Sequence, residues 1–135
     1  MTILLFIIWN LYSFFEGFRE GFYYNIVNRT SFTKTLNLHP FFSTQRGLVI
    51  LLMFMLEFTH IGCVNSLLFC LCCSIAFPFI HDGTYYTTRH YLDKKLYENG
   101  WFSQSTSSTA LMTKVFTPVI RTVLFIIGTI CIFIL

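Results

Sequence analysis

Charged side chains are scarce in this chain. Asp, Glu, Lys and Arg make up 11% of the 135 residues, whereas hydrophobic residues make up 55% and the mean hydropathy is +0.65. Soluble domains usually carry about 25% charged residues, and a domain this small buries only a limited share of its surface. The composition excludes an ordinary soluble domain and predicts an all-α integral membrane protein whose apolar surface faces the lipid bilayer.

Sequence motifs that identify enzymes are also missing. The chain has no P-loop, no G-x-G-x-x-G, no G-x-S-x-G elbow and no cluster of histidine boxes. No cofactor is expected. The net charge is only +3, and Lys94-Lys95 is no more than a basic dipeptide, so no nucleic-acid partner is predicted. The N-terminus lacks a basic region and an A-x-A-like site, so we expect a retained helix rather than a signal peptide.

The cysteines lie in apolar surroundings, where cysteine behaves as a small hydrophobe. They are Cys63, Cys70, Cys72, Cys73 and Cys131. The run at 70–73 lacks the spacing and the polar setting of a zinc site, so structural cysteines and no metal are expected. A Cys63–Cys131 disulfide stays open as an alternative if both residues face an oxidising compartment.

Apolar runs predict transmembrane helices over 2–25, 47–60, 65–80 and 118–135. The stretch 47–80 exceeds the roughly 20 residues that one span needs. We therefore divide it near 61–66, where Gly62, Asn65 and Ser66 supply turn residues. A three-span alternative has one helix over about 47–70.

Two polar connectors separate these helices. His39-Pro40 marks a break in the first connector. In the second, His81-Asp82-Gly83-Thr84 resembles a turn with a helix cap. Residues 84–98 then form a short interfacial amphipathic helix, followed by a polar loop over 103–109.

The basic residues give an orientation. In the four-span topology all nine Lys and Arg residues belong to the two connectors or to adjoining helix ends. The positive-inside rule then places both connectors in the cytoplasm and both termini outside, in a plasma or inner membrane. The three-span topology loses this asymmetry.

The first helix carries a polar stripe. Its polar positions recur every three or four residues and so share one helical face; they are Asn10, Ser13, Glu16, Gly17, Glu20 and Tyr24. Phenylalanines occupy the opposite face. We expect the polar face to turn inward and the phenylalanine face to meet lipid.

Several charged residues share one depth near the cytoplasmic face. With a rise of about 1.5 Å per residue, the helix ends predict a polar cluster of Glu16, Glu20, His81, Asp82 and Arg121. Arg19 and Arg89 are expected at its rim. This cluster is either a structural ion-pair network or a site for an ion or ligand.

Glu57 and His60 form a second candidate site within the membrane. Their i, i+3 spacing puts them on one helical face. Glu-x-x-His is half of a di-iron motif, but the chain lacks the second half. A mutual hydrogen bond or a proton-accepting Glu57 is the better interpretation.

Three functional hypotheses follow. The first is a non-enzymatic membrane component: a subunit, an assembly factor or a holin-like pore former, although the chain lacks a basic C-terminal tail. The second is an ion, proton or small-solute transport component, which at this size requires a homo-oligomer or a larger complex. The third is a membrane enzyme with a cytoplasm-side Glu/His/Asp site.

Overall fold

The computed structural model describes residues 1–27, 39–104 and 115–135, and these residues form an all-helical bundle. Its elements are α1 (Thr2–Val27), α2 (His39–Leu92), the 3-10 turn η1 (Gly100–Phe102) and α4 (Pro118–Ile134). The predicted all-α class is confirmed for the described residues. By length and composition one described helix, Pro40–Leu92, could cross a membrane, and α4 is a shorter apolar helix.

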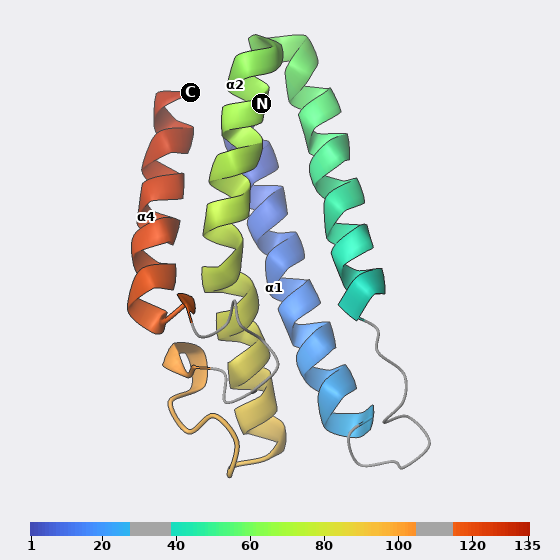
Figure 1. Cartoon of the computed structure of the whole chain (residues 1–135), viewed down its shortest axis with the longest axis vertical. Helices are drawn as coiled ribbons and strands as arrows, with labels where there is room; N and C mark the ends of the chain where they lie inside the picture. Colours follow the sequence, from blue (N-terminus) through green and yellow to red (C-terminus); the bar gives the residue numbers. More distant parts are fainter. Residues whose placement is uncertain (28–38, 105–114) are drawn as a thin grey trace.

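Helix α2 is folded into a hairpin at Gly62. This residue has φ 74° and ψ 173°, a conformation that residues with a Cβ avoid. Figure 1 shows the chain reversing there, so that a first arm (39–61) and a second arm (63–92) run side by side in opposite directions. The straight helix over 47–70 that the three-span alternative requires is therefore not what the structure has.

The second arm corrects two predicted boundaries. Residues 81–84 do not form a turn, because α2 continues through them to Leu92, and no separate helix begins at 84. Gly83 serves close packing instead: a Cβ at this position would collide with the indole of Trp101. The helix also begins at His39 rather than at 47, because a proline such as Pro40 is well tolerated in a first helical turn.

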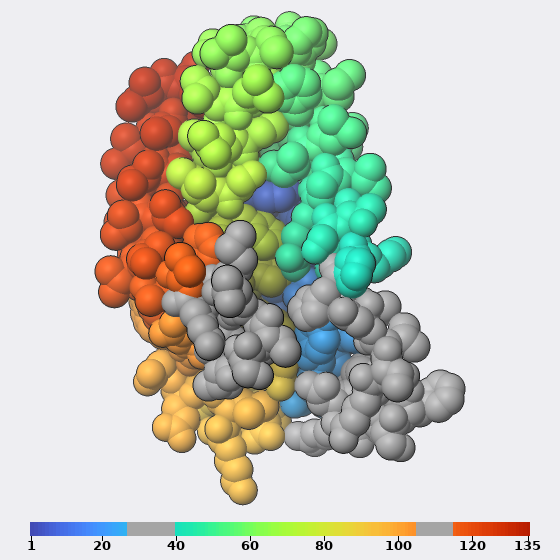
Figure 2. All heavy atoms as spheres, in the orientation of Figure 1, coloured from blue at the N-terminus to red at the C-terminus, as the bar shows by residue number. Residues whose placement is uncertain are grey.

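The second arm of α2 is the centre of the bundle. It packs against α1 on one side and α4 on the other, whereas α1 and α4 barely touch. In Figure 2, α1 is visible between the two arms of α2, behind them. Trp9 of α1 is 2% exposed, and its indole nitrogen donates to the Cys73 carbonyl over 2.8 Å. Gly17 lets the same two helices meet closely, since a Cβ there would collide with the His81 carbonyl oxygen.

The two ends of the bundle differ. Both chain termini lie toward the end where α2 bends at Gly62, whereas α1 ends and α4 begins toward the other end (Figure 1). We name the latter the connector end. Large apolar side chains cover the outside of every long helix; examples are Phe15, Leu52, Leu71 and Ile134, all more than half exposed. The five cysteines are free thiols, so the Cys63–Cys131 disulfide is not formed.

Candidate functional site

Charged side chains from all three long helices meet at the connector end. We call this cluster the polar layer; its members are Glu16 and Glu20 of α1, Arg46 of the first arm, His81 and Asp82 of the second arm, and Arg121 of α4. The structure thus brings together the five residues that share a depth in the sequence. It adds Arg46, one of the basic residues that the sequence analysis counted only with the two connectors.

Arg46 joins the first arm to α1 and to the second arm. Its Nε donates to Oε1 of Glu16 over 3.0 Å, and its Nη2 pairs with Oε1 of Glu20. The guanidinium also lies over the ring of Phe77, 4.9 Å from the centroid. The side chains of Glu16 and Glu20 are 1% and 5% exposed. Arg46 is therefore the main counter-charge of two carboxylates that water hardly reaches.

His81 links Arg46 to Asp82. Nη2 of Arg46 lies 3.0 Å from Nε2 of His81, and Nδ1 of His81 lies 2.9 Å from Oδ1 of Asp82. A carboxylate accepts hydrogen bonds, so Nδ1 is the donor to Asp82. Nε2 faces both Nη2 of Arg46 and Oε2 of Glu20, the latter over 3.5 Å. The imidazole also stacks on Phe77, with 4.7 Å between ring centroids. These contacts hold the ring in one orientation.

Arg121 extends the polar layer to α4. The Thr117 hydroxyl caps the helix by accepting from the amide of Ile120 over 3.3 Å, which places Arg121 in the first turn. Although 1% exposed, the Arg121 guanidinium donates to the carbonyl oxygens of Ser103, over 2.7 Å, and Trp101, over 3.4 Å. Its Nη1 is 3.9 Å from Oδ2 of Asp82. Arg121 therefore connects η1 and the residue that follows it to α4.

Among the described residues, and with His81 neutral, the formal charges of the polar layer and its rim cancel. Three carboxylates, from Glu16, Glu20 and Asp82, face three guanidinium groups, from Arg19, Arg46 and Arg121. Arg19 is the rim member: its side chain is 46% exposed and lies 3.8 Å from Oε1 of Glu16. The charged groups are thus directed at one another.

Within the described residues, Arg89 forms no ion pair with the polar layer. Its Nη1 donates to the Tyr85 hydroxyl over 2.7 Å, and its guanidinium lies 5.8 Å from the centre of the Tyr97 ring. Across residues 1–27, 39–104 and 115–135, no group of three or more His, Cys, Asp or Glu side chains has an arrangement that could hold a metal ion.

Glu57 is a separate, isolated carboxyl group. It is fully buried, and its Oε2 accepts from the Thr2 hydroxyl over 3.0 Å. Its Oε1 has no hydrogen-bond partner within the described part of the chain. His60 is exposed, and the structure gives no hydrogen bond between these two side chains. The predicted pairing of Glu57 with His60 is therefore wrong. Side chains three residues apart point in somewhat different directions around the helix axis, so Glu57 faces inward while His60 faces outward.

The pairing of Arg46 with Glu16 and Glu20 was not predicted from the sequence, because residues 39–46 were assigned to the first polar connector and not to a helix. A signal was present, since Pro40 suits the first turn of a helix that would carry Arg46 to the depth of Glu16.

In comparisons with known proteins, no protein-family model, curated protein or solved structure matches this chain.

Proposed function

We propose that this chain is a small polytopic membrane protein that crosses the bilayer four times and serves as a non-enzymatic membrane component. The observation that carries the proposal is the distribution of polarity. Apolar side chains cover the outside of the long helices, while the charged side chains that pair between helices gather in the polar layer at one end. Such a surface is costly in water and suited to hydrocarbon.

Helix lengths support this proposal. At about 1.5 Å per residue, the 26 residues of α1 extend over about 39 Å, and the 17 residues of α4 over about 26 Å. The two arms of α2 supply two more crossings. A typical hydrocarbon core is about 30 Å thick. Connectors on the cytoplasmic side would bring the polar layer to the headgroup region, where charged groups are tolerated.

The internal pairing of the polar layer favours a component over an enzyme. Glu16, Glu20 and Asp82 are each matched with a buried or half-buried arginine, which leaves them poorly placed to act on a substrate. Within this proposal the chain functions through association, as a subunit, an assembly factor or a pore-forming oligomer. Its partners would be the bilayer and other membrane proteins, including further copies of itself.

The topology can be tested with single cysteines. In a cysteine-free background, native Cys63 is restored alone, or cysteine is placed at Lys34 or Lys95; Lys34 lies outside the described residues. An impermeant maleimide added to intact cells should label Cys63 and leave both lysine positions unlabelled until the cells are permeabilised. Labelling of Lys95→Cys together with Cys63 in intact cells would contradict the four-span topology. Release of the chain from membranes by alkaline washing would contradict membrane insertion altogether.

A second candidate function is proton or cation transport through Glu57. The burial of this carboxyl and the unpaired Oε1 favour it, because acidic groups inside a membrane are costly and commonly functional. Glu57 is 11 residues beyond Arg46, or about 16 Å along the first arm, so it is distinct from the polar layer. In liposomes containing a pH-sensitive dye, the wild-type protein should dissipate a proton gradient and a folded Glu57→Gln variant should not. Equal rates would exclude Glu57 from transport.

A further inference from the structure

His81 is the histidine of the polar layer, and charged or titratable groups from every long helix surround it. Its side chain is 8% exposed. The surrounding groups are Glu20 of α1, Arg46 of the first arm, Asp82 and Tyr85 of its own arm and, through Asp82, Arg121 of α4. Histidine is the side chain whose charge changes most readily near neutral pH. A change of pH therefore acts on this layer through His81.

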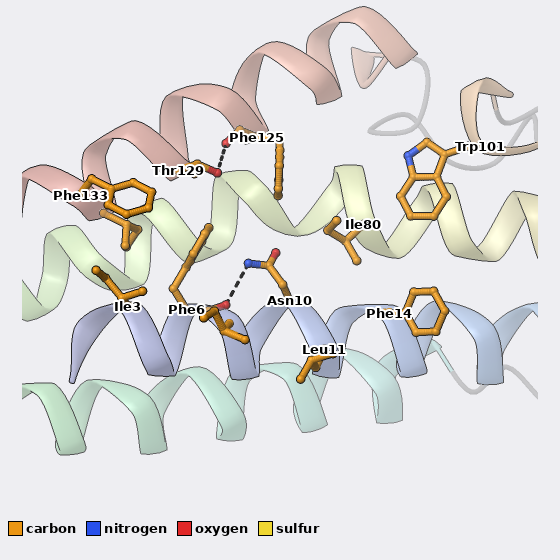
Figure 3. A pocket seen from close by; sticks show the side chains of 12 residues that line it. Ile3, Phe6, Asn10, Leu11, Phe14, Ile80, Trp101, Phe125, Thr129 and Phe133 are labelled. Carbon is orange, nitrogen blue, oxygen red and sulfur yellow. Dashed lines mark hydrogen bonds between the residues drawn. The ribbon is translucent and has the colours of Figure 1, made fainter.

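The neighbouring side of the second arm carries no charge. Ile80, the residue before His81, points into the space between α1 and α4, together with Phe14, Phe125 and Trp101 (Figure 3). Within the described residues, the side chains that line this space are all uncharged. The charged groups that respond to His81 are therefore those of the polar layer and its rim.

The Nε2 atom of His81 lies between a donor and an acceptor. Nη2 of Arg46 is 3.0 Å away, and Oε2 of Glu20 is 3.5 Å away. Because Nδ1 donates to Asp82 over 2.9 Å, Nε2 of the neutral ring has only a lone pair and accepts from Arg46. In the charged ring both nitrogens carry hydrogen, so Nε2 donates to Glu20 instead. The two charge states of His81 therefore require different partners for Nε2.

Glu16 provides a second acceptor for Arg46. The Nε atom of Arg46 donates to Oε1 of Glu16 over 3.0 Å. Oε2 of the same carboxylate is buried and has no hydrogen-bond partner among the described residues, and leaving such an atom unpaired costs free energy. A small rotation of the guanidinium brings Nη2 to this oxygen. The result is a pairing through two parallel hydrogen bonds, which is the strong geometry between arginine and a carboxylate.

We propose that the polar layer is a proton-operated switch, in which protonation of His81 transfers one hydrogen bond of Arg46 from His81 to Oε2 of Glu16. The proton comes from water and binds to the lone pair of Nε2. Water reaches the site because the side chains of Arg46 and Asp82 are 26% and 22% exposed. With His81 neutral, Arg46 joins the first arm to both α1 and the second arm; with His81 charged, it pairs with α1 alone.

This inference goes beyond the proposed role as a membrane component. It concerns contacts inside the bundle, so it does not depend on which way the chain crosses the bilayer. Its consequence is that acid weakens the polar contact between the two arms of α2 at the connector end and strengthens the one between the first arm and α1.

Nitrogen NMR of the whole chain in detergent micelles tests the proposal. Ring spectra show which nitrogen of a histidine is protonated, and His81 is identified among the four histidines by the signals that His81→Gln lacks. At about pH 8 His81 should be neutral with its proton on Nδ1, and at about pH 5 both nitrogens should carry hydrogen. The Nη signals of Arg46, identified with Arg46→Lys, should shift with the same midpoint.

Three results with the wild type would each overturn the proposal. They are a His81 that keeps one charge state over this pH range, a neutral His81 with its proton on Nε2, and Arg46 signals that do not follow the titration of His81.

Glu16→Gln tests where the hydrogen bond goes. The glutamine amide keeps an oxygen for Nε of Arg46 and replaces Oε2 with a donor, so His81 should still titrate while the response of Arg46 is lost. Glu98→Gln is the matched control, because it makes the same change at an exposed residue outside the polar layer, and its Arg46 should respond as in the wild type. An equal Arg46 response in the two variants would also refute the switch.

Discussion

Replacement of Arg46 by methionine is the most informative perturbation of the polar layer. The change leaves the Glu16 and Glu20 carboxylates, 1% and 5% exposed, without their main counter-charge. Breaking a buried ion pair from one side costs about 3–5 kcal/mol. Because 26% of the Arg46 side chain is exposed, we expect about 3 kcal/mol, at the lower end of that range. The loss of the guanidinium from the face of Phe77 acts in the same direction.

The free energy of unfolding can be measured by titration with sodium dodecyl sulfate in mixed micelles. Trp9 is a suitable probe because it lies between α1 and the second arm of α2. Arg19→Met is the matched control: it also removes one arginine next to Glu16, but its side chain is 46% exposed and 3.8 Å away. Exposed pairs contribute about 0–1 kcal/mol, so this control should change little.

A rescue experiment separates charge from packing. Adding Glu16→Gln and Glu20→Gln to Arg46→Met removes the uncompensated carboxylates and should restore most of the lost stability, because replacing a buried ion pair as a unit is often neutral. If Arg46→Met costs no more than Arg19→Met, or if the triple variant is as unstable as Arg46→Met alone, the two carboxylates do not depend on Arg46 for their stability.

Two glycines give further predictions in the same titration, with Gly47→Ala as the common control. Gly17→Ala should lower the free energy of unfolding by about 2 kcal/mol or more, because its Cβ meets the backbone of His81; a neutral result would mean that α1 and α2 are farther apart. Gly62→Ala should cost about 1–3 kcal/mol, because φ 74° with ψ 173° is accessible only to glycine, and a stabilised variant would contradict the hairpin. Gly47 has open space around its Cβ position, so its replacement should stabilise the helix by about 0.5–1 kcal/mol.

Helical periodicity was sufficient to orient α1. The stripe predicted to face inward contains Ser13, Glu16 and Glu20, which are all buried, whereas Phe15 and Phe18 on the opposite face are exposed. The depth argument likewise placed residues of different helices at one level, because rise per residue is nearly constant in helices. Both inferences use only the geometry of a single helix, and such geometry can be calculated from sequence.

Contacts between side chains of different helices could not be predicted from the sequence pattern. Gly83 beside Asp82 is typical of a turn in the local sequence. A glycine is needed here inside a helix because the indole of Trp101 packs against this position. Arg46 could be counted as a basic residue but could not be assigned to Glu16 and Glu20, because that pairing depends on how the first arm lies against α1. The predicted partner of Glu57 was wrong for the same reason, because its carboxylate accepts from the hydroxyl of Thr2, which is 55 residues away in sequence.

The hairpin at Gly62 has a consequence for biogenesis in the proposed orientation. No lysine or arginine occurs between Arg46 and Arg89, so the two arms can enter the bilayer together without carrying a basic group through it. Arg46 precedes Gly62 by 16 residues and His81 follows it by 19, or about 24 and 28 Å along the two arms. The side chains of Arg46 and His81 therefore meet only when both arms have been inserted into the bilayer to the same depth.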